Sequence, residues 1–298
     1  MSQRSMLRIA LPNKGRLAEE TRELFNDAGL EVKVRGERAL TASLGGAFEA
    51  IFVRAQDIPE FVADGAADAG VTGWDLIAES SRNLHTLADL AFGRCQLAVA
   101  ATDESGIASL DDLRAGARVA TAFPRLTQRF FCQREQPVEI VPVSGATEIA
   151  PHLGIADIIV DLVSTGSTLR TNGLHVIATV LESSARLVCA PVDTEDQLGV
   201  NGDCRRRELR ELVDALQSVL RARDKRYIMA NVPRSRLGAV RRVLPGITGP
   251  TVIDLLNGGE HVAVHAVAPA AGIYRTIAEL KALGAEGILV TRIERLMP

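Results

Sequence analysis

Strand-length apolar runs alternate with helical patterns through the first part of the chain. LRIAL at residues 7–11 precedes a helical pattern at 17–28, and AADAGVTG at 66–73 precedes another at 74–79. This alternation is typical of βαβ units and predicts a mainly parallel sheet. A second series of such units follows the run CQLAVAAT at 95–102. The sequence therefore predicts an α/β fold with two such units in tandem.

The segment ARLVCAPV at 185–192 has the pattern of a further strand, placed after the second unit. Such a strand can carry the chain back into the first unit, and two crossings between units give a two-lobed body with a cleft. The predicted first lobe comprises residues 1–98 and 188–211. The predicted second lobe comprises residues 99–187.

The chain from residue 203 onward has a different pattern. Six aliphatic residues recur at helical spacing between 209 and 220 with charges between them, which predicts a long amphipathic connecting helix. The arginines of this helix could form an anion-binding site. Acidic residues lie between them, which favours an ordinary solvated helix surface instead. Residues 227–298 follow the order βαββαβ, which is the ferredoxin-like arrangement. We therefore predict a C-terminal domain at residues 212–298.

Composition narrows the classes of partner. The 298 residues are 47% hydrophobic, 24% charged and 4% aromatic, with a formal net charge of −3. Without a basic excess, the chain has no broad attraction to nucleic acid or anionic membranes. Its apolar runs fall short of the roughly 18 residues that a membrane span needs, and its start lacks a signal-peptide pattern. We expect a cytoplasmic protein with small-molecule partners, whose four isolated cysteines are buried, reduced thiols.

The stretch VDLVSTGSTL at 160–169 joins one acid to a run of small hydroxyl residues. Asp161 falls at the carboxyl end of a predicted strand, where open α/β sheets bind ligands. The turn from Ser164 to Thr168 contains Gly166, and its backbone N–H groups and hydroxyls can surround a phosphate at a helix start. An acid for ribose hydroxyls beside a phosphate site describes a ribose 5-phosphate. A helix cap made by the serines and threonines explains the same pattern equally well.

A Walker loop and a GxGxxG motif are both absent, but an acid followed after two residues by STGST resembles the phosphoribosyl pyrophosphate loop of phosphoribosyltransferases. The longer run DIIVDLVSTGSTLRTNGL is similar to the signature of the ATP phosphoribosyltransferase family, which begins histidine biosynthesis. Similar segments stand in the same order over nearly the whole chain, among them LRIALPNKGRL, DIPEFVADGAADAGVTGWD, FGRCQLAVA, KRYIMANVP and ELKALGAEGILV. The resemblance implies a two-lobed catalytic body similar to periplasmic binding proteins, with the C-terminal regulatory domain of the family's long form.

The resemblance also implies an activity. The family condenses ATP, through N1 of its adenine, with phosphoribosyl pyrophosphate, uses Mg²⁺ and is inhibited by histidine. Its members form dimers and hexamers, so a homo-oligomer is expected. Displacing pyrophosphate from the anomeric carbon requires little covalent help from the protein, so positioning, cations and magnesium should dominate.

In the second lobe, Asp161 is the expected catalytic residue and should hold the ribose hydroxyls. Residues expected to contact phosphoribosyl pyrophosphate are Asp157, Asp161, Ser164, Thr165, Gly166, Ser167 and Thr168. Glu148 and Asp157 are candidate magnesium ligands, with helix capping and surface charge as the alternative. The commoner phosphoribosyltransferases have two adjacent acids here, whereas this chain has Val160 before Asp161. A paired-acid contact to the ribose therefore cannot be assumed.

In the first lobe, four residues at strand ends match family segments and are expected to contact ATP: Lys14, Arg16, Arg54 and Gly73. Arg16 is also expected to act in catalysis by meeting phosphate charge at a helix start. The alternatives are a solvated loop lysine for Lys14, a surface ion pair for Arg54 and a tight turn for Gly73.

In the C-terminal domain, Thr251 and Asp254 are the candidate histidine-binding residues, or they only end a strand.

Three other classes of protein share parts of this pattern. A solute-binding protein has the same two-lobed body, but the absent signal peptide counts against export. A transcriptional regulator needs a helix-turn-helix head before LRIAL. An inactive regulatory subunit is disfavoured by the presence of both STGST and NKGR. The sequence therefore favours an enzyme.

Overall fold

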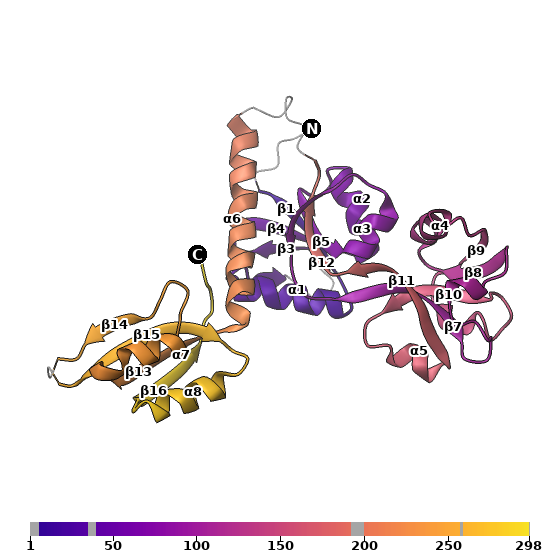
Figure 1. Ribbon diagram of the computed structural model, residues 1–298. Helices are drawn as coiled ribbons and strands as arrows, with labels where there is room; N and C mark the ends of the chain where they lie inside the picture. The colour runs from indigo at the N-terminus through magenta and orange to yellow at the C-terminus, as the bar shows by residue number, and fades with distance from the viewer. Residues whose placement is uncertain (1–5, 35–39, 192–199, 257–258, 298) are drawn as a thin grey trace. The chain divides into compact units, whose positions relative to one another are not determined.

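The computed structural model describes residues 6–34, 40–191, 200–256 and 259–297. Contacts divide the chain into two units, one formed by residues 1–26 and 30–209, the other by 27–29 and 210–298. The first unit contains a seven-stranded and a five-stranded sheet, and the second contains a four-stranded sheet (Figure 1).

The first sheet is built from β1 Arg8–Pro12, β2 Val32–Val34, β3 Thr41–Leu44, β4 Phe48–Val53, β5 Ala69–Gly73, β6 His85–Asp89 and β12 Ala185–Cys189, accompanied by helices α1 Arg16–Asp27, α2 Ile58–Ala63 and α3 Trp74–Ser80. Its strand order is β2-β3-β4-β1-β5-β12-β6. The neighbouring strands β4, β1 and β5 run parallel, and β12 lies antiparallel between β5 and β6. β1 is buried from Ile9 onward, as its apolar run predicts.

The second sheet is built from β7 Cys95–Thr102, β8 Ala117–Thr121, β9 Val138–Pro142, β10 Ile158–Val163 and β11 Leu174–Ser183, accompanied by α4 Pro124–Cys132 and α5 Ser167–Thr171. Its order is β11-β7-β10-β8-β9, with β10, β8 and β9 parallel and β7 antiparallel to both of its neighbours. Leu126 and Phe130 of α4 belong to the apolar cluster on one face, and Leu169 of α5 to the cluster on the other.

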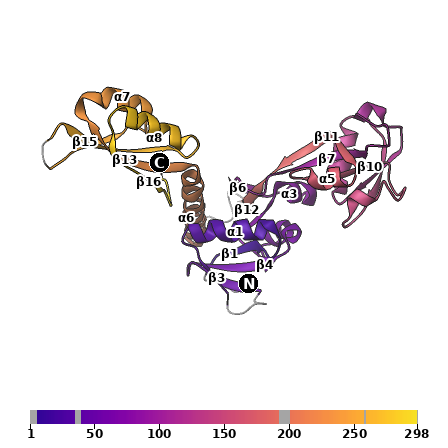
Figure 2. The same ribbon diagram turned by 90° about the horizontal axis from the view of Figure 1, so that it is seen from below.

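The chain crosses between these two sheets twice (Figures 1 and 2). β6 ends in the first sheet at Asp89 and β7 begins in the second at Cys95, while β11 ends at Ser183 and β12 begins at Ala185 back in the first. The expected return strand is therefore present. The borders predicted at residues 98 and 188 fall inside β7 and β12, a few residues from the points at which the sheet changes.

The expectation of mainly parallel sheets is wrong. In each sheet three neighbouring strands are parallel, but the remaining pairs are antiparallel. Two of the antiparallel strands, β7 and β12, carry the crossings themselves. A crossing strand can join its new sheet in either direction, and alternation of apolar runs with helices does not record that direction.

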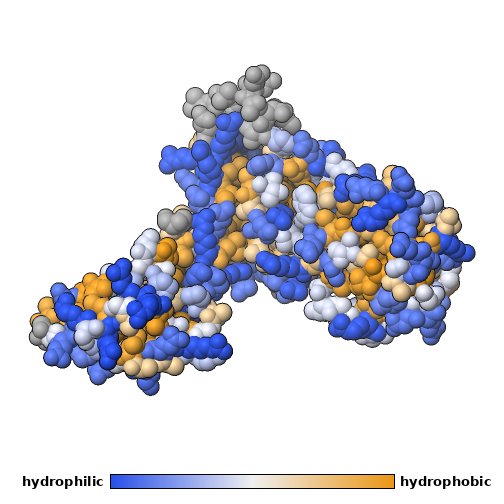
Figure 3. Space-filling view, viewed as in Figure 1, coloured by the Kyte–Doolittle hydropathy of each residue, from blue (hydrophilic) through white to orange (hydrophobic). Residues whose placement is uncertain are grey.

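The C-terminal module is formed by β13 Lys225–Pro233, α7 Leu237–Val243, β14 Thr251–Asp254, β15 His261–Pro269, α8 Ile273–Ala282 and β16 Glu286–Arg292, after the long helix α6 Val200–Arg223. The strand order β14-β15-β13-β16 is antiparallel throughout, which confirms the ferredoxin-like prediction. Val240 of α7 and Leu280 of α8 lie in the core on one side of this sheet. Hydrophobic side chains also lie at the module's surface (Figure 3), among them Ile253 and Leu289 on the two edge strands.

Two further expectations concern the thiols and the membrane. All four cysteines are free, but only Cys189 is buried and Cys95 is half-buried, whereas Cys132 and Cys204 are exposed. The expectation of four buried thiols is thus wrong, because Cys132 ends α4 and Cys204 lies on the solvated side of α6. Over the described residues, no helix combines the length and apolarity needed to cross a membrane.

Candidate active site

Three parallel strands of the first sheet end at the same edge. β4 ends at Val53, β1 at Pro12 and β5 at Gly73, and β1 lies between the other two. Ligands of open α/β sheets bind at this kind of edge, where the loops after the strands meet. Every first-lobe residue predicted to contact ATP lies in one of these three loops or at the start of the helix that follows.

Lys14 and Arg54 come together at this edge. They line one pocket of about 350 Å³ with Ala55, Gln56 and Leu76, which we call the Lys14–Arg54 pocket. Both cationic side chains are exposed, and neither is in an ion pair among the contacts of the described residues. The alternative of a surface ion pair for Arg54 is therefore not realised in the structure. Two unpaired cations in one concavity suit a polyphosphate.

Arg16 lies one residue beyond the left-handed Gly15, which has φ 79°, at the first position of α1. Its Nε donates to Glu20 Oε1 at 3.3 Å, and its side chain is 67% exposed. An exposed pair of this kind costs little to exchange for a ligand phosphate. A Cβ on Gly93, two residues before β7, would lie 3.1 Å from Cδ1 of Leu17, the residue after Arg16. The start of α1 is therefore close to the point at which the chain leaves for the second sheet.

Position 73 needs a glycine because of the side chain of Asp75, not because of its backbone angles. Its φ of −76° is open to any residue, but a Cβ at this position would lie 2.3 Å from Oδ1 of Asp75. Asp75 is buried and accepts a hydrogen bond of 2.5 Å from the hydroxyl of Ser183, the last residue of β11. The missing Cβ of Gly73 thus leaves room for the buried carboxylate of Asp75, and the predicted contact of Gly73 with ATP stays a prediction.

Three parallel strands of the second sheet also end at one edge. β10, β8 and β9 end at Val163, Thr121 and Pro142. The loops that follow them contain the STGST stretch, the segment 122–125 and the segment 143–148. Asp161 and the hydroxyl residues therefore come from the end of β10, and Glu148 follows the end of β9 at the same edge with β8 in between, although up to 20 residues separate them in the sequence.

The hydroxyl loop, residues Ser164–Thr168, turns at Gly166, which has φ 72° and forms the N-cap of α5 without a side-chain cap bond. Thr165 Oγ1 lies 2.9 Å from Ser167 Oγ and 3.5 Å from Ser167 N, too long for a firm cap. No hydrogen bond from the hydroxyl of Ser164 or Thr168 to another described residue is seen. Capping of α5 therefore does not explain why this loop carries so many hydroxyls.

Asp161 lies at the base of the hydroxyl loop. Its Oδ1 accepts the N–H of Leu162 at 2.8 Å. Burial raises the pKa of the Asp161 carboxyl above its ordinary value, and the negative charge of Glu148 raises it further, against the effect of hydrogen bonding from Leu162 and Thr147. Thr147, which was not selected from the sequence, is buried and stands beside Glu148 in the stretch SGATE at 144–148.

Asp157 is not brought to this group. It precedes β10 at the opposite end of the strand, where Arg118 N–H donates to its Oδ2 at 2.7 Å and Arg114 forms an ion pair with it at 3.0 Å. Partial burial acts to raise the pKa of Asp157, but these partners hold it below the ordinary value. The ligand and metal roles predicted for Asp157 are therefore corrected to a structural one, because the carboxylate is already paired at the far end of the strand.

A second pocket lies where the two crossing strands meet. This hinge pocket, about 470 Å³, is lined by Asp89, Arg94, Cys95, Gln96, Val163, Ser164, Glu182, Ser183, Ser184 and Arg186. It includes the first residue of the hydroxyl loop and so adjoins it. Burial raises the pKa of the Cys95 thiol, and the charge of Asp75 raises it further. Cys95 is therefore a poor nucleophile in this setting.

The residues predicted for histidine binding lie on the edge strand β14. Thr251 and Asp254 are exposed at its two ends, and Asp254 forms an ion pair with Arg234. Among the described residues, no group of three His, Cys, Asp or Glu side chains is placed to hold a metal ion by itself. Glu148 lies in the turn Thr147–Ile149, which contacts β10, the strand that carries Asp161; one or two carboxylates are what protein sites commonly supply to Mg²⁺ when substrate phosphates complete its shell.

Comparisons with known proteins point in one direction. Residues 54–218 match the family described as ATP phosphoribosyltransferase (HisG), and residues 222–295 match the HisG C-terminal domain. A protein of Gemmatimonas aurantiaca named ATP phosphoribosyltransferase is 66% identical over 297 residues, covering 98% of this chain and 100% of its own length. One of Methanocaldococcus jannaschii with the same name is 44% identical over 296 residues, with coverage of 98% and 100%. A solved ATP phosphoribosyl transferase (HisG:HisZ) complex from Thermotoga maritima matches with a TM-score of 0.60 and 26% identity, covering 71% of this chain and 99% of that chain.

Proposed function

Because the chain belongs to the ATP phosphoribosyltransferase family of histidine biosynthesis, we propose that it joins N1 of the adenine of ATP to the anomeric carbon of phosphoribosyl pyrophosphate. The lone pair of N1 forms the new C–N bond, and the C–O bond to pyrophosphate breaks with its electron pair on the leaving oxygen. This proposal rests on the residues at the two strand-end edges. The edge of the first sheet has the unpaired cations Lys14 and Arg54, and the edge of the second sheet has Asp161 beside the hydroxyl loop.

The hydroxyl loop holds the 5-phosphate of phosphoribosyl pyrophosphate in this proposal. Gly166 turns the backbone so that the loop can surround an anion, and the hydroxyls of Ser164 and Thr168 are available as donors. The carboxylate of Asp161 accepts from the ribose hydroxyls, while the N–H of Leu162 keeps it oriented. Together these contacts fix the anomeric carbon relative to the second sheet, and such positioning lowers the barrier without covalent participation.

The first lobe binds ATP and stabilises the charge of the phosphates. Lys14 and Arg54 line a pocket large enough for phosphate groups, and Arg16 lies at the start of α1 with only an exposed partner. Charge-assisted hydrogen bonds from these side chains lower the energy of negative charge that develops on the leaving pyrophosphate. Arg16, near the crossing strands, is the cation best placed to act during the reaction.

Magnesium fits the second-lobe carboxylates. Glu148 lies in the turn that contacts β10, and its negative charge adds to the raised pKa of Asp161; a bound cation would relieve that repulsion. When bound, Mg²⁺ would neutralise pyrophosphate charge and so make it a better leaving group. Glu148 and Asp161 would hold the ion, and the phosphates would complete its shell.

Regulation and assembly complete the proposal. Histidine inhibits the enzyme by binding to the C-terminal module at Thr251 and Asp254, whose hydroxyl and carboxylate suit an amino acid's charged ends. The chain acts as a homo-oligomer, a dimer or a hexamer, in the cytoplasm. The match to the HisG C-terminal domain supports the first statement, and the Thermotoga structure, titled as a HisG:HisZ complex, supports assembly within the family.

The first test is release of pyrophosphate by the purified chain given ATP, phosphoribosyl pyrophosphate and Mg²⁺, with and without histidine. Release should require both substrates and should fall when histidine is added. No release, with binding of either substrate demonstrated by calorimetry, would reject the proposed reaction.

The second test addresses Asp161 directly. Asp161→Asn should weaken binding of phosphoribosyl pyrophosphate by roughly 10- to 100-fold, the usual cost of a lost charged hydrogen-bond partner. Asp111→Asn is the matched control, since Asp111 is exposed in the same lobe and lies in the turn Leu110–Asp112 before the start of β8, whereas the strand-end edge follows the end of that strand. Equal affinities of the two variants by calorimetry would remove Asp161 from the site.

A further inference from the structure

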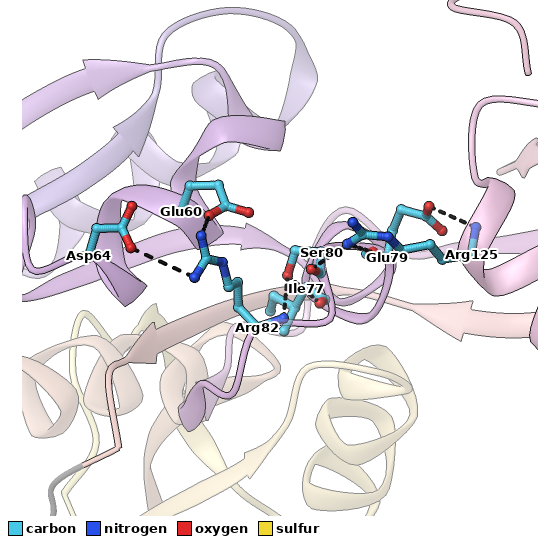
Figure 4. A network of polar contacts seen from close by, with 7 residues as sticks. All are labelled: Glu60, Asp64, Ile77, Glu79, Ser80, Arg82 and Arg125. Atoms are coloured by element: carbon cyan, nitrogen blue, oxygen red, sulfur yellow. Dashed lines mark hydrogen bonds and ion pairs between the residues drawn. The ribbon is translucent and has the colours of Figure 1, made fainter.

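Helices α3 and α4 come from different lobes, and each satisfies the unpaired backbone groups at the other's end (Figure 4). The Oε1 and Oε2 atoms of Glu79, near the end of α3, each accept one backbone N–H at the start of α4, from Arg125 and Leu126, both at 2.9 Å. In return, the guanidinium of Arg125 donates to the carbonyls of Ser80 at 2.7 Å and Glu79 at 3.4 Å. We call this exchange the Glu79–Arg125 clasp.

The start of α4 depends on this outside partner. Its N-cap residue, Phe123, has no side-chain acceptor, and its first helical residue, Pro124, has no N–H. The Phe123 N–H is satisfied by Thr121 Oγ1 at 2.9 Å. The next two donors, on Arg125 and Leu126, are the ones that a capping side chain normally takes. Here a carboxylate from 46 residues earlier takes both.

The clasp also places each charge where a helix dipole favours it. Glu79 brings a negative charge to the N-terminus of α4, and Arg125 brings a positive charge to the C-terminus of α3. Beneath these contacts, Leu76 and Ala78 of α3 pack against the apolar cluster of the second sheet that includes Phe123 and Leu126. The two lobes are thus joined by polar contacts over an apolar base.

The far side of α3 is anchored as well. Arg82, just after the helix, forms ion pairs with Glu60 and with Asp64 of the α2 region, the latter at 3.7 Å. The Ser80 hydroxyl donates to Ile77 O at 2.7 Å and accepts the Arg82 N–H at 3.2 Å (Figure 4). The end of α3 is therefore fixed to the first lobe. Because the clasp joins this end of α3 to the start of α4, it also fixes α4 relative to the first lobe.

Each of the two clasped helices lies next to one half of the site, α3 next to the Lys14–Arg54 pocket and α4 next to the strand end beside the hydroxyl loop. α3 follows Gly73 at the end of β5, and its Leu76 lines the Lys14–Arg54 pocket. α4 follows β8, whose end lies beside the end of β10 and the hydroxyl loop. The separation of the two half-sites is therefore coupled to the contact between these helices.

We propose that Glu79 and Arg125 are positioning residues that hold the two lobes at the separation needed for transfer between their substrates. This inference rests on the proposed function, in which ATP binds to the first lobe and phosphoribosyl pyrophosphate to the second. Neither residue touches a substrate. Each acts by keeping N1 and the anomeric carbon within reacting distance, where a misplacement of about 1 Å can cost roughly 100-fold in rate.

The variants Glu79→Gln and Arg125→Ala test the clasp. Glutamine has the same shape as glutamate but turns one acceptor into a donor that faces an N–H, and alanine removes the guanidinium. Glu23→Gln on α1 and Arg129→Ala on α4 are the matched controls, because both side chains are exposed and no partner for either is seen among the described residues. The double variant shows whether both residues act through one contact.

The expected result is a loss of kcat with intact binding. Transfer by Glu79→Gln and Arg125→Ala should slow by roughly 10- to 100-fold, while calorimetric affinities for ATP and for phosphoribosyl pyrophosphate, each measured alone, should stay within about twofold of the wild type. The double variant should lose little beyond the worse single variant. An unchanged kcat, or a loss confined to the affinity for one substrate, would overturn the proposal.

A second readout does not depend on turnover. Trp74, the sole tryptophan of the chain, begins α3, and its backbone N–H donates to Ser184 O at 3.0 Å beside the crossing. Its emission and its quenching by acrylamide should change in the clasp variants and stay constant in the two controls. If the variants alter Trp74 while the wild type releases no pyrophosphate, the clasp holds and the proposed function fails. Identical emission in all variants would reject the clasp itself.

Discussion

Replacing Gly73 with alanine should destabilise the hinge through a single neighbour, Asp75. The added Cβ would lie 2.3 Å from Oδ1, 3.2 Å from Cγ and 3.5 Å from Oδ2 of that residue, and these are the three nearest atoms. Asp75 cannot simply turn aside, because its carboxylate is buried and bonded to the Ser183 hydroxyl at 2.5 Å and to the Leu76 N–H. The substitution therefore forces a choice between a steric overlap and an unpaired buried charge.

The expected cost follows from these contacts. A hydrogen bond to a charged group contributes about 1.5–3 kcal/mol, and overpacking a tight site typically costs about 1–3 kcal/mol. Because Asp75 can relieve part of the overlap by giving up part of the bond, the two costs do not add in full. We expect Gly73→Ala to lower the free energy of unfolding by about 2–4 kcal/mol.

Urea unfolding followed by the fluorescence of Trp74, which lies between the two residues, measures this cost. The decisive comparison is Gly73→Ala made in the wild type and made again in Asp75→Ala. Once the carboxylate is gone, the nearest atom to the new Cβ is at ordinary contact distance, so the second cost should fall below about 1 kcal/mol. Equal costs in the two backgrounds would refute the assignment of Gly73 to the Asp75 carboxylate.

Three further outcomes are expected. Burial raises the pKa of Asp75 from its ordinary value of 3.8, so the wild type loses stability as the pH rises from the ordinary pKa through the raised one. Asp75→Asn should therefore gain melting temperature relative to the wild type as the pH is raised from about 4, and a difference that stays constant with pH would contradict this. Arg54→Ala should raise the KM for ATP by roughly tenfold or more and leave that for phosphoribosyl pyrophosphate unchanged in steady-state assays. Thr251→Ala combined with Asp254→Asn should abolish inhibition by histidine at unchanged kcat, and undiminished inhibition would place the effector elsewhere.

The sequence was most informative where one physical signal dominated. A fully buried parallel strand requires a continuous apolar run, and LRIAL at β1 has one. The C-terminal βαββαβ order followed from alternating runs of the same kind. β11 was missed because its register against β7 shifts between Val176 and Ala178 and again between Thr179 and Leu181. Each shift moves the following side chains to the other face, so the period of two is lost.

Some site residues could be predicted from the sequence and others could not. Lys14 and Arg54 could be selected because ligands bind where parallel strands end, and the ends of β1 and β4 are adjacent. Asp157 was misplaced by its nearness in sequence to Asp161, since four residues of extended chain span roughly 13 Å. Asp75 gave no sequence signal at all, because its partner Ser183 lies 108 residues away and the pair forms only through the chain's two crossings.

The net charge of the chain bears on how such a site can work. Both proposed substrates are polyanions, yet the protein has a formal net charge of −3, so long-range attraction cannot supply their affinity. Affinity has to come from cations gathered at one edge, as Lys14 and Arg54 are, and from neutral donors at the other, as the hydroxyl loop provides. Because the cations lie in the first lobe and the neutral donors in the second, each lobe can bind its own substrate in the absence of the other. In this proposal catalysis also depends on contacts that touch neither substrate, because the crossing strands, the Glu79–Arg125 clasp and the apolar contacts beneath it determine how far apart the two bound molecules lie.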